Sequence, residues 1–134
     1  MRNTENKIMF AFSEELDTAF LHDLYGDDLQ QAEMVFESSV QQIKTEIILA
    51  QAKFHDGDLQ GLKKVIHKMK PLFGYIGMNE VMEEFAAFEK ICLEEQAAAN
   101  LEQQFQYILI TTQQSLLKAE KEVKRLKQFN TQYL

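Results

Sequence analysis

The sequence predicts an all-α protein: an antiparallel up-down-up-down four-helix bundle with a short extra N-terminal helix. The chain has 134 residues but only five glycines and one proline, which is little turn punctuation for a sheet of several strands. Four segments repeat apolar residues at spacings of three and four, the period of one buried helix face. Because the breaks between these segments are short, antiparallel packing of neighbouring helices is the simplest arrangement.

The length and composition of the chain limit the number of domains and the kinds of partner that we expect. We expect an N-terminal tail over residues 1–12 and one domain over residues 13–131, because this length suits a single core. The formal net charge of -7 argues against nucleic acid as a partner. We find no signal peptide and no apolar run of membrane-spanning length, so we expect a cytoplasmic, monomeric protein without a membrane partner.

The first helix follows an aromatic segment that contains Phe10 and Phe12. We expect this segment to pack across one end of the bundle. Ser13 is a typical N-cap residue and is followed by two glutamates, which suit the positive end of a helix. These features predict a helix from Ser13 to about His22, acting as a lid on the bundle.

The four longer helices are marked by aspartate, asparagine and glycine at their ends. Asp27, with a glutamine three residues later, predicts the start of a second helix that ends in the sequence HDGD. Asp58 begins a third helix, which closes near Gly77. Asn79 is a candidate cap for the fourth helix, and the fifth follows the sequence AAAN and carries apolar residues from Leu101 onward.

The third helix places His67 opposite its apolar face. At about 100° per residue, one side collects the core residues: Leu62, Val65, Ile66, Met69, Leu72, Phe73 and Ile76. The neighbours of His67 at three and four residues are lysines and one proline. We therefore expect an exposed imidazole in a positively charged strip.

A surface histidine is compatible with several kinds of site. Lysines beside it usually form an ordinary solvated helix face. No His, Asp, Glu or Cys lies three or four residues from His67, so no pair of metal ligands is present on this helix. No serine or cysteine is placed as a nucleophile, since Cys92 falls on an apolar stripe. A neutral imidazole is, however, a good nucleophile for a phosphoryl group. The lysines would favour the neutral ring and then attract the phosphoryl oxygens.

The residues around His67 resemble the signature of a known family. His67-Lys68-Met69-Lys70 is followed by Gly74 and by Ile76-Gly77, and upstream a long helix and an Asp-containing turn lead into the histidine helix. This order is similar to that of histidine phosphotransfer (HPt) domains. The resemblance covers about residues 13–95, whereas the last helix matches only in length and periodicity.

The resemblance implies a histidine-containing phosphocarrier in a two-component phosphorelay. His67 would accept a phosphoryl group from the aspartate of a receiver domain, such as that of a hybrid sensor histidine kinase, and pass it to another response-regulator receiver. Lys70 would accompany the phosphoryl group, and Glu89 on the next helix would orient the ring. The receiver would supply Mg²⁺, so the chain would need no metal or cofactor and would not be a complete enzyme.

The resemblance also implies a docking surface around His67, formed by Lys63, Lys64, Pro71, Gly74 and Gly77. Pro71 departs from the family, which usually has glycine four residues after the histidine. A proline there lacks the N–H that would bond to the carbonyl of His67, which predicts a bend in the helix. The bend would either reshape the docking surface for a particular partner, or leave a helical adaptor (pseudo-HPt) that binds receivers or other partners without phosphotransfer.

Overall fold

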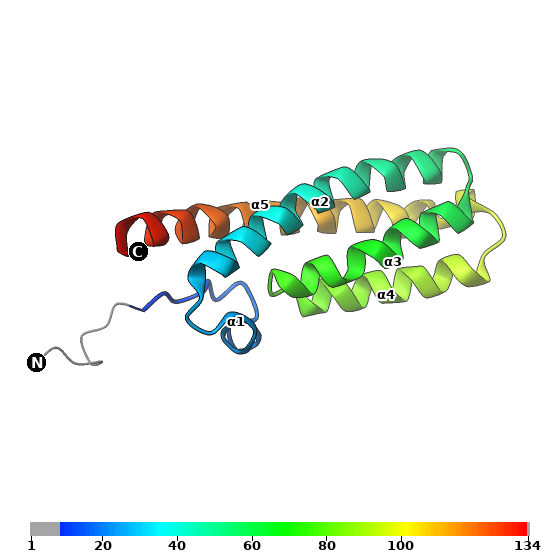
Figure 1. Cartoon of the computed structure of the whole chain (residues 1–134). Coiled ribbons are helices and arrows are strands. Elements are labelled where there is room, and N and C mark those ends of the chain that lie inside the picture. The colour runs from blue at the N-terminus through cyan, green and yellow to red at the C-terminus, as the bar shows by residue number, and fades with distance from the viewer. Residues whose placement is uncertain (1–8, 134) are drawn as a thin grey trace, which may run out of the picture.

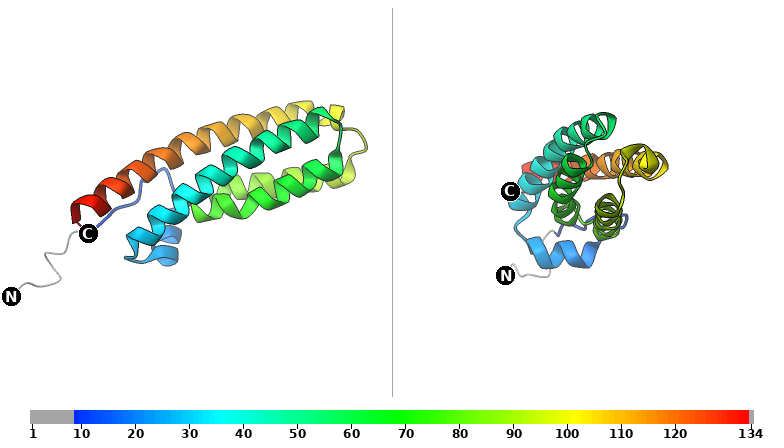
Figure 2. Two further views of the ribbon diagram at one scale, coloured as in Figure 1. Left: turned by 45° about the horizontal axis from the view of Figure 1, so that its top comes forward. Right: turned by 90° about the vertical axis from the view of Figure 1, so that its right-hand side faces the viewer.

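The computed structural model describes residues 9–133, and the regular structure in that range is entirely helical. The elements are α1 (Thr18–Tyr25), α2 (Leu29–His55), α3 (Leu59–Tyr75), α4 (Asn79–Glu94), a short 3₁₀ helix η2 (Ala98–Leu101) and α5 (Glu102–Tyr133). The four long helices lie alongside one another, and α1 lies across the end of α3 and α4, past which α2 and α5 extend (Figures 1 and 2). The predicted all-helical class is therefore confirmed.

One core joins the four long helices. Its fully buried aromatic side chains come from α2, α3, α4 and α5: Phe36, Phe73, Phe85 and Phe105. Phe54 stacks on Phe105 with ring centroids 4.4 Å apart, which ties the end of α2 to the start of α5. α3 packs extensively against α2 and α4, whereas α4 packs much less closely against α5. The bundle is consequently closed around α3 and more open between α4 and α5.

Aspartates begin α2 and α3. The side chain of Asp28 accepts a hydrogen bond from the Gln31 N–H at 3.1 Å, so the prediction that Asp27 caps α2 is wrong by one residue. The sequence contains two consecutive aspartates and two consecutive glutamines, and both registers have the same capping-box spacing. Asp58 caps α3 as predicted, accepting from the Gly61 N–H at 2.9 Å.

α4 begins with help from a distant residue. Asn79 is its first residue rather than its cap, so the predicted capping role is wrong. The Asn79 N–H donates instead to the carboxylate of Asp17 at 2.9 Å, and the Asp17 N–H donates to the Gly77 carbonyl at 2.8 Å. The residue that satisfies the start of α4 therefore lies just before α1, which attaches α1 to the turn between α3 and α4.

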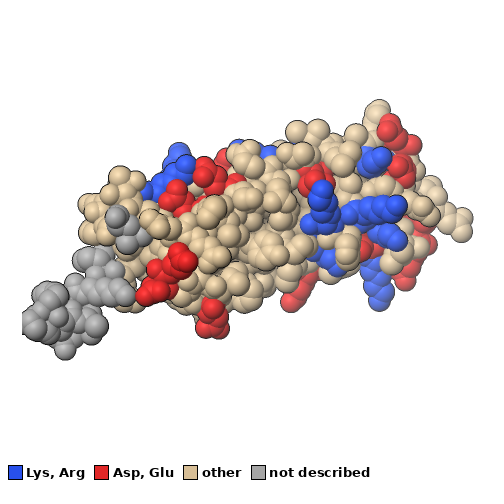
Figure 3. Space-filling model, in the orientation of Figure 1, with Lys and Arg blue, Asp and Glu red and all other residues tan. Residues whose placement is uncertain are grey.

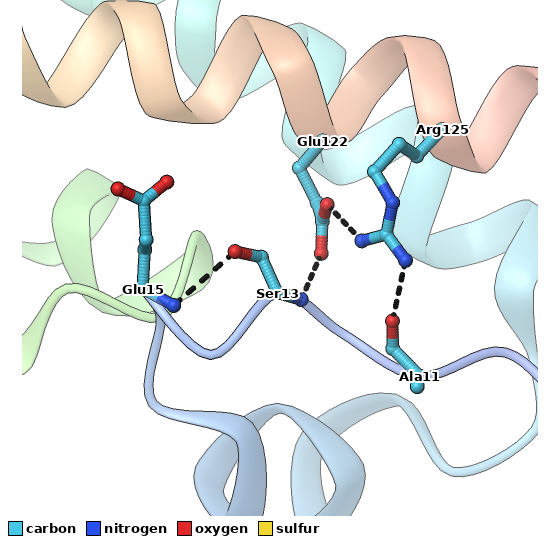
Figure 4. Close-up of polar contacts among 5 residues, drawn as sticks. All are labelled: Ala11, Ser13, Glu15, Glu122 and Arg125. Carbon is cyan, nitrogen blue, oxygen red and sulfur yellow. Dashed lines mark hydrogen bonds and ion pairs between the residues drawn. The ribbon is translucent and has the colours of Figure 1, made fainter.

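α1 starts at Thr18, five residues later than predicted. Ser13 is not a helix cap, because its hydroxyl accepts only from the Glu15 N–H at 3.2 Å in a turn (Figure 4). The segment before α1 instead buries two rings in the core, Phe10 at 8% exposure and Phe12 at 3%. The expectation that these aromatic residues pack against the bundle is confirmed. Phe10 and Phe12, which fall in the expected tail over residues 1–12, belong to the core; residues 1–8 lie outside the described range.

A buried carboxylate holds this segment against α5. Glu122 is 1% exposed and accepts from the Ser13 N–H at 2.7 Å. Glu122 also pairs with Arg125, whose other nitrogen donates to the Ala11 carbonyl at 2.8 Å (Figure 4). The guanidinium of Arg125 lies 4.7 Å from the centre of the Phe10 ring, in cation–π geometry. These contacts explain why residues 10–17 cross the bundle end instead of extending α1.

Candidate functional site

His67 lies on the outer face of α3. Its side chain is 68% exposed, while Ile66 and Met69 beside it are fully buried. The predicted exposure of the ring is therefore confirmed, and it follows from the apolar period of α3, which directs the other face into the core.

Glu89 of α4 contacts the ring of His67. The distance from His67 Nδ1 to Glu89 Oε2 is 2.8 Å, so the predicted contact across 22 residues of sequence is present. A carboxylate can only accept a hydrogen bond, which places a proton on Nδ1. In the neutral ring the lone pair is then at Nε2, which has no hydrogen-bond partner within residues 9–133.

Glu89 also binds Lys70. The Lys70 Nζ lies 2.7 Å from Oε1, so one carboxylate bridges the histidine ring and the lysine. Burial alone would raise the pKa of Glu89, whose side chain is 17% exposed, but the hydrogen bonds from Lys70 and His67 outweigh burial and lower the pKa below its ordinary value. Glu89 is thus a carboxylate at neutral pH, and three side chains from two helices form one connected cluster.

The surroundings of His67 are less positive than the sequence suggests. Lysines do gather over the face formed by α3 and α4 (Figure 3). However, Lys68 pairs with Glu46 of α2 at 3.1 Å, and Lys70 pairs with Glu89. Lys63 and Lys64 lie one turn before His67, half-buried and exposed respectively. The expected strip of ammonium groups is therefore partly neutralised by carboxylates from α2 and α4.

Glu46 is a site residue that the sequence analysis missed. It is 8% exposed and lies three residues after Ile43, within the apolar stripe of α2. An acid in a buried register usually has a cationic partner, because burying an unpaired charge is costly. That anomaly in the α2 stripe could have predicted a lysine of α3 as its partner.

Pro71 lies inside α3 without ending it. The helix continues through Pro71 to Tyr75, so the proline does not interrupt it; the predicted bend stays a prediction. The His67 carbonyl has no N–H donor at residue 71, because proline has none. Pro71 is exposed, one turn beyond His67.

An apolar hollow adjoins this part of α3. It has a volume of about 500 Å³ and is lined by side chains of α1, α3 and α4, among them Phe20, Leu24, Pro71, Tyr75 and Met82. Phe20, Leu24 and Tyr75 are 41%, 43% and 44% exposed. The sequence analysis named Pro71 but not the two residues of α1. Phe20 and Leu24 could have been found from their spacing of four residues, which puts them on one side of α1 next to the buried Leu21 and Tyr25.

The two glycines predicted for docking lie beneath the surface. Gly74 is buried where a Cβ would lie 3.3 Å from the sulfur of Met82, so it permits α3 and α4 to pack closely. Gly77 is buried under α1 with φ of +73°, and a Cβ there would lie 2.6 Å from Leu21 Cδ1. Gly77 cannot contact a partner and is removed from the candidate docking surface. Gly74 contributes only to the lining of the hollow.

The described residues do not form a metal site or a reactive cysteine site. Within residues 9–133, no group of three or more His, Cys, Asp or Glu is placed to hold a metal ion. Cys92 is buried, and burial raises the pKa of its thiol to about 11, so it is protonated at neutral pH. Over the same residues, no helix combines the length and the apolar character that crossing a bilayer requires.

Comparison of the chain with known proteins gives no match among family models, curated proteins or solved structures. The resemblance to HPt domains therefore stays a prediction from the residues quoted above.

Proposed function

We propose that this chain is an HPt-type phosphocarrier that accepts a phosphoryl group on His67 from a receiver-domain aspartate and passes it to another receiver. The observation that carries the proposal is the exposed ring of His67 with its Nδ1 held by Glu89 at 2.8 Å. The proposal includes the up-down-up-down order of α2 to α5, which the short connections between these helices support. It also includes a monomeric protein in the cytoplasm. A hybrid sensor histidine kinase is the expected donor.

The proposed transfer uses Nε2 of His67 as the nucleophile. Its lone pair attacks phosphorus, the N–P bond forms, the P–O bond to the receiver aspartate breaks, and the aspartate leaves as a carboxylate. The proton on Nδ1 stays in place, and Glu89 stabilises the positive charge that develops on the ring. Reversal of the same step on a second receiver discharges the carrier. Mg²⁺ would come from the receiver.

Lys70 is the proposed partner of the phosphoryl oxygens. Lys70 already belongs to the cluster around His67, because its Nζ lies 2.7 Å from Glu89 Oε1. Its side chain is 24% exposed. The arrival of a dianionic group at Nε2 would supply a stronger partner than a carboxylate shared with His67. We expect Lys70 to share or exchange partners when His67 is phosphorylated.

Receiver docking is proposed at the apolar hollow one turn beyond His67. Its exposed rings, Phe20 and Tyr75, offer apolar area, and Lys63 and Lys64 lie on the opposite side of His67 along α3. Apolar contact flanked by charge is typical of transient protein interfaces.

The test is transfer from a receiver domain of a hybrid histidine kinase charged with ³²P-labelled acetyl phosphate in Mg²⁺. We expect acid-labile, base-stable label on the wild-type chain, loss of label in His67→Gln, and unchanged label in His55→Gln, a matched exposed histidine at the end of α2. Receiver binding without label on the wild type would overturn the carrier in favour of the adaptor. Label retained in His67→Gln would place the chemistry elsewhere.

A further inference from the structure

A second apolar groove lies between α4 and α5. It has a volume of about 430 Å³, and its apolar lining comes from Ala87, Phe88 and Ile91 of α4 and from Tyr107 and Ile108 of α5. The groove exists because α4 packs closely against α3 but only sparingly against α5. Two helices held apart in this way leave a channel that fits the side chains of a third helix.

The groove is separate from the His67 site. On α4, Glu89 lies two residues from both Ala87 and Ile91, which places it about 160° around the helix from each of them. Glu89 contacts His67 on the α3 side, whereas Ala87 and Ile91 line the α5 side. A partner in this groove would therefore leave His67 accessible.

Exposed apolar side chains continue from the groove along α5. Tyr107, Ile110 and Leu117 are 54%, 52% and 65% exposed, and their spacings of three and seven residues put them on one side of the helix. The distance from the first to the last is about 15 Å, the length of roughly three helical turns. The exposed area is thus a stripe, which fits a helix better than a small ligand.

The one charged residue that lines the groove within the described part of the chain is acidic. Glu84 lines it and accepts a hydrogen bond from the Tyr107 hydroxyl at 2.5 Å, and Glu80 lies one turn away on the same side of α4. The opposite wall contributes Gln103 and Gln104, and residues 101–117 contain no lysine or arginine. A second copy of this chain would bring one acidic edge against another, which is unfavourable. A basic partner is complementary.

We propose that the α4–α5 groove binds an amphipathic helix of a partner protein, whose apolar face fills the groove and whose lysines or arginines face Glu80 and Glu84. This inference does not depend on phosphotransfer at His67. It gives the protein a second interaction surface on the side of α4 away from the candidate site.

The probe is a synthetic 18-residue amphipathic peptide of leucine, alanine and lysine, with a matched peptide in which glutamate replaces lysine. Binding to the full ¹⁵N-labelled chain is followed by NMR titration. We expect the lysine peptide to shift amides of α4 and of residues 101–117, and Ile110→Glu to abolish these shifts. Ile48→Glu, at an exposed position on α2, should leave them unchanged.

Charge reversal separates local complementarity from net charge. Glu80→Lys with Glu84→Lys should weaken the lysine peptide about fivefold, the effect of two exposed ion pairs, and should favour the glutamate peptide. Glu14→Lys with Glu15→Lys makes the same change in net charge at exposed positions before α1 and should have little effect. Equal effects of both pairs, shifts spread over the whole chain, or no binding would overturn the proposal. A concentration-dependent dimer that Ile110→Glu dissociates would instead assign the groove to a second copy.

Discussion

Replacement of Gly77 by alanine tests how firmly α1 is held on the bundle. Gly77 has φ of +73° and lies under Leu21, whose Cδ1 would be 2.6 Å from an added Cβ. Gly57 provides a matched control, because its φ is +72° and nothing lies within 4 Å of an added Cβ. The two substitutions share the same backbone strain and differ only in the packing of α1.

The expected magnitudes follow from these two contributions. An alanine in the left-handed region costs about 1–2 kcal/mol, which is the whole effect expected for Gly57→Ala. Gly77→Ala adds the cost of overpacking, about 1–3 kcal/mol, because Leu21 is fully buried and has no solvent-filled space to move into. The free energy of unfolding should therefore fall by about 2–5 kcal/mol for Gly77→Ala.

Urea unfolding of the full chain, followed by far-ultraviolet circular dichroism, measures both effects. Leu21→Ala removes the atoms that an alanine at residue 77 would touch. In that background Gly77→Ala should destabilise the protein no more than Gly57→Ala does, giving a double-mutant coupling of about 1–3 kcal/mol. Equal losses for the two single variants, with no coupling to Leu21, would show that α1 does not pack on Gly77. The α1 wall of the apolar hollow would then be misplaced.

Three further substitutions test the cluster and the helix around His67. Glu89→Gln should reduce the loss of stability between about pH 6 and pH 3. The pKa of Glu89 is lowered in the folded protein, so the contribution of this carboxylate to stability is complete above its ordinary pKa of 4.5 and is lost as the pH falls through the folded pKa. Parallel pH profiles of the urea midpoint for variant and wild type would contradict this. Pro71→Ala supplies an N–H for the His67 carbonyl and should raise the free energy of unfolding by about 1–3 kcal/mol; a lower urea midpoint would show that α3 does not need that bond. Tyr25→Phe removes the hydroxyl that donates to the Tyr75 carbonyl at 2.6 Å and should cost about 1 kcal/mol in the same assay, whereas an unchanged midpoint would mean that the bond adds nothing to stability.

Much of the helical architecture could be read from local patterns. Apolar spacing predicted the four long helices, Asp58 was correctly placed at the start of α3, and the position of His67 opposite the apolar face predicted its exposure. These properties depend on residues within a few turns of one another. A helix face is set by neighbours along the chain, so the sequence is sufficient to find it. Of the predicted caps, only Asp58 was placed correctly.

Apart from the choice between Asp27 and Asp28, the corrections arise where distant segments meet. Ser13 has good capping chemistry, yet α1 starts later because Glu122 and Arg125 of α5 hold the segment that precedes it. Gly77 fits the expected motif and is covered by α1. Contacts of this kind depend on which helix lies beside which, and a local pattern does not contain that information.

The charges around His67 are also determined partly by the sequence and partly by the packing of the helices. The spacing of the lysines along α3 determines that they share the outer part of the helix with His67. Only the packing of three helices decides that Glu46 neutralises Lys68 and that Glu89 bridges Lys70 and His67. The reason is physical: a helix period follows from bonds four residues apart, whereas an ion pair between helices requires their relative rotation and height to be correct within a few ångströms.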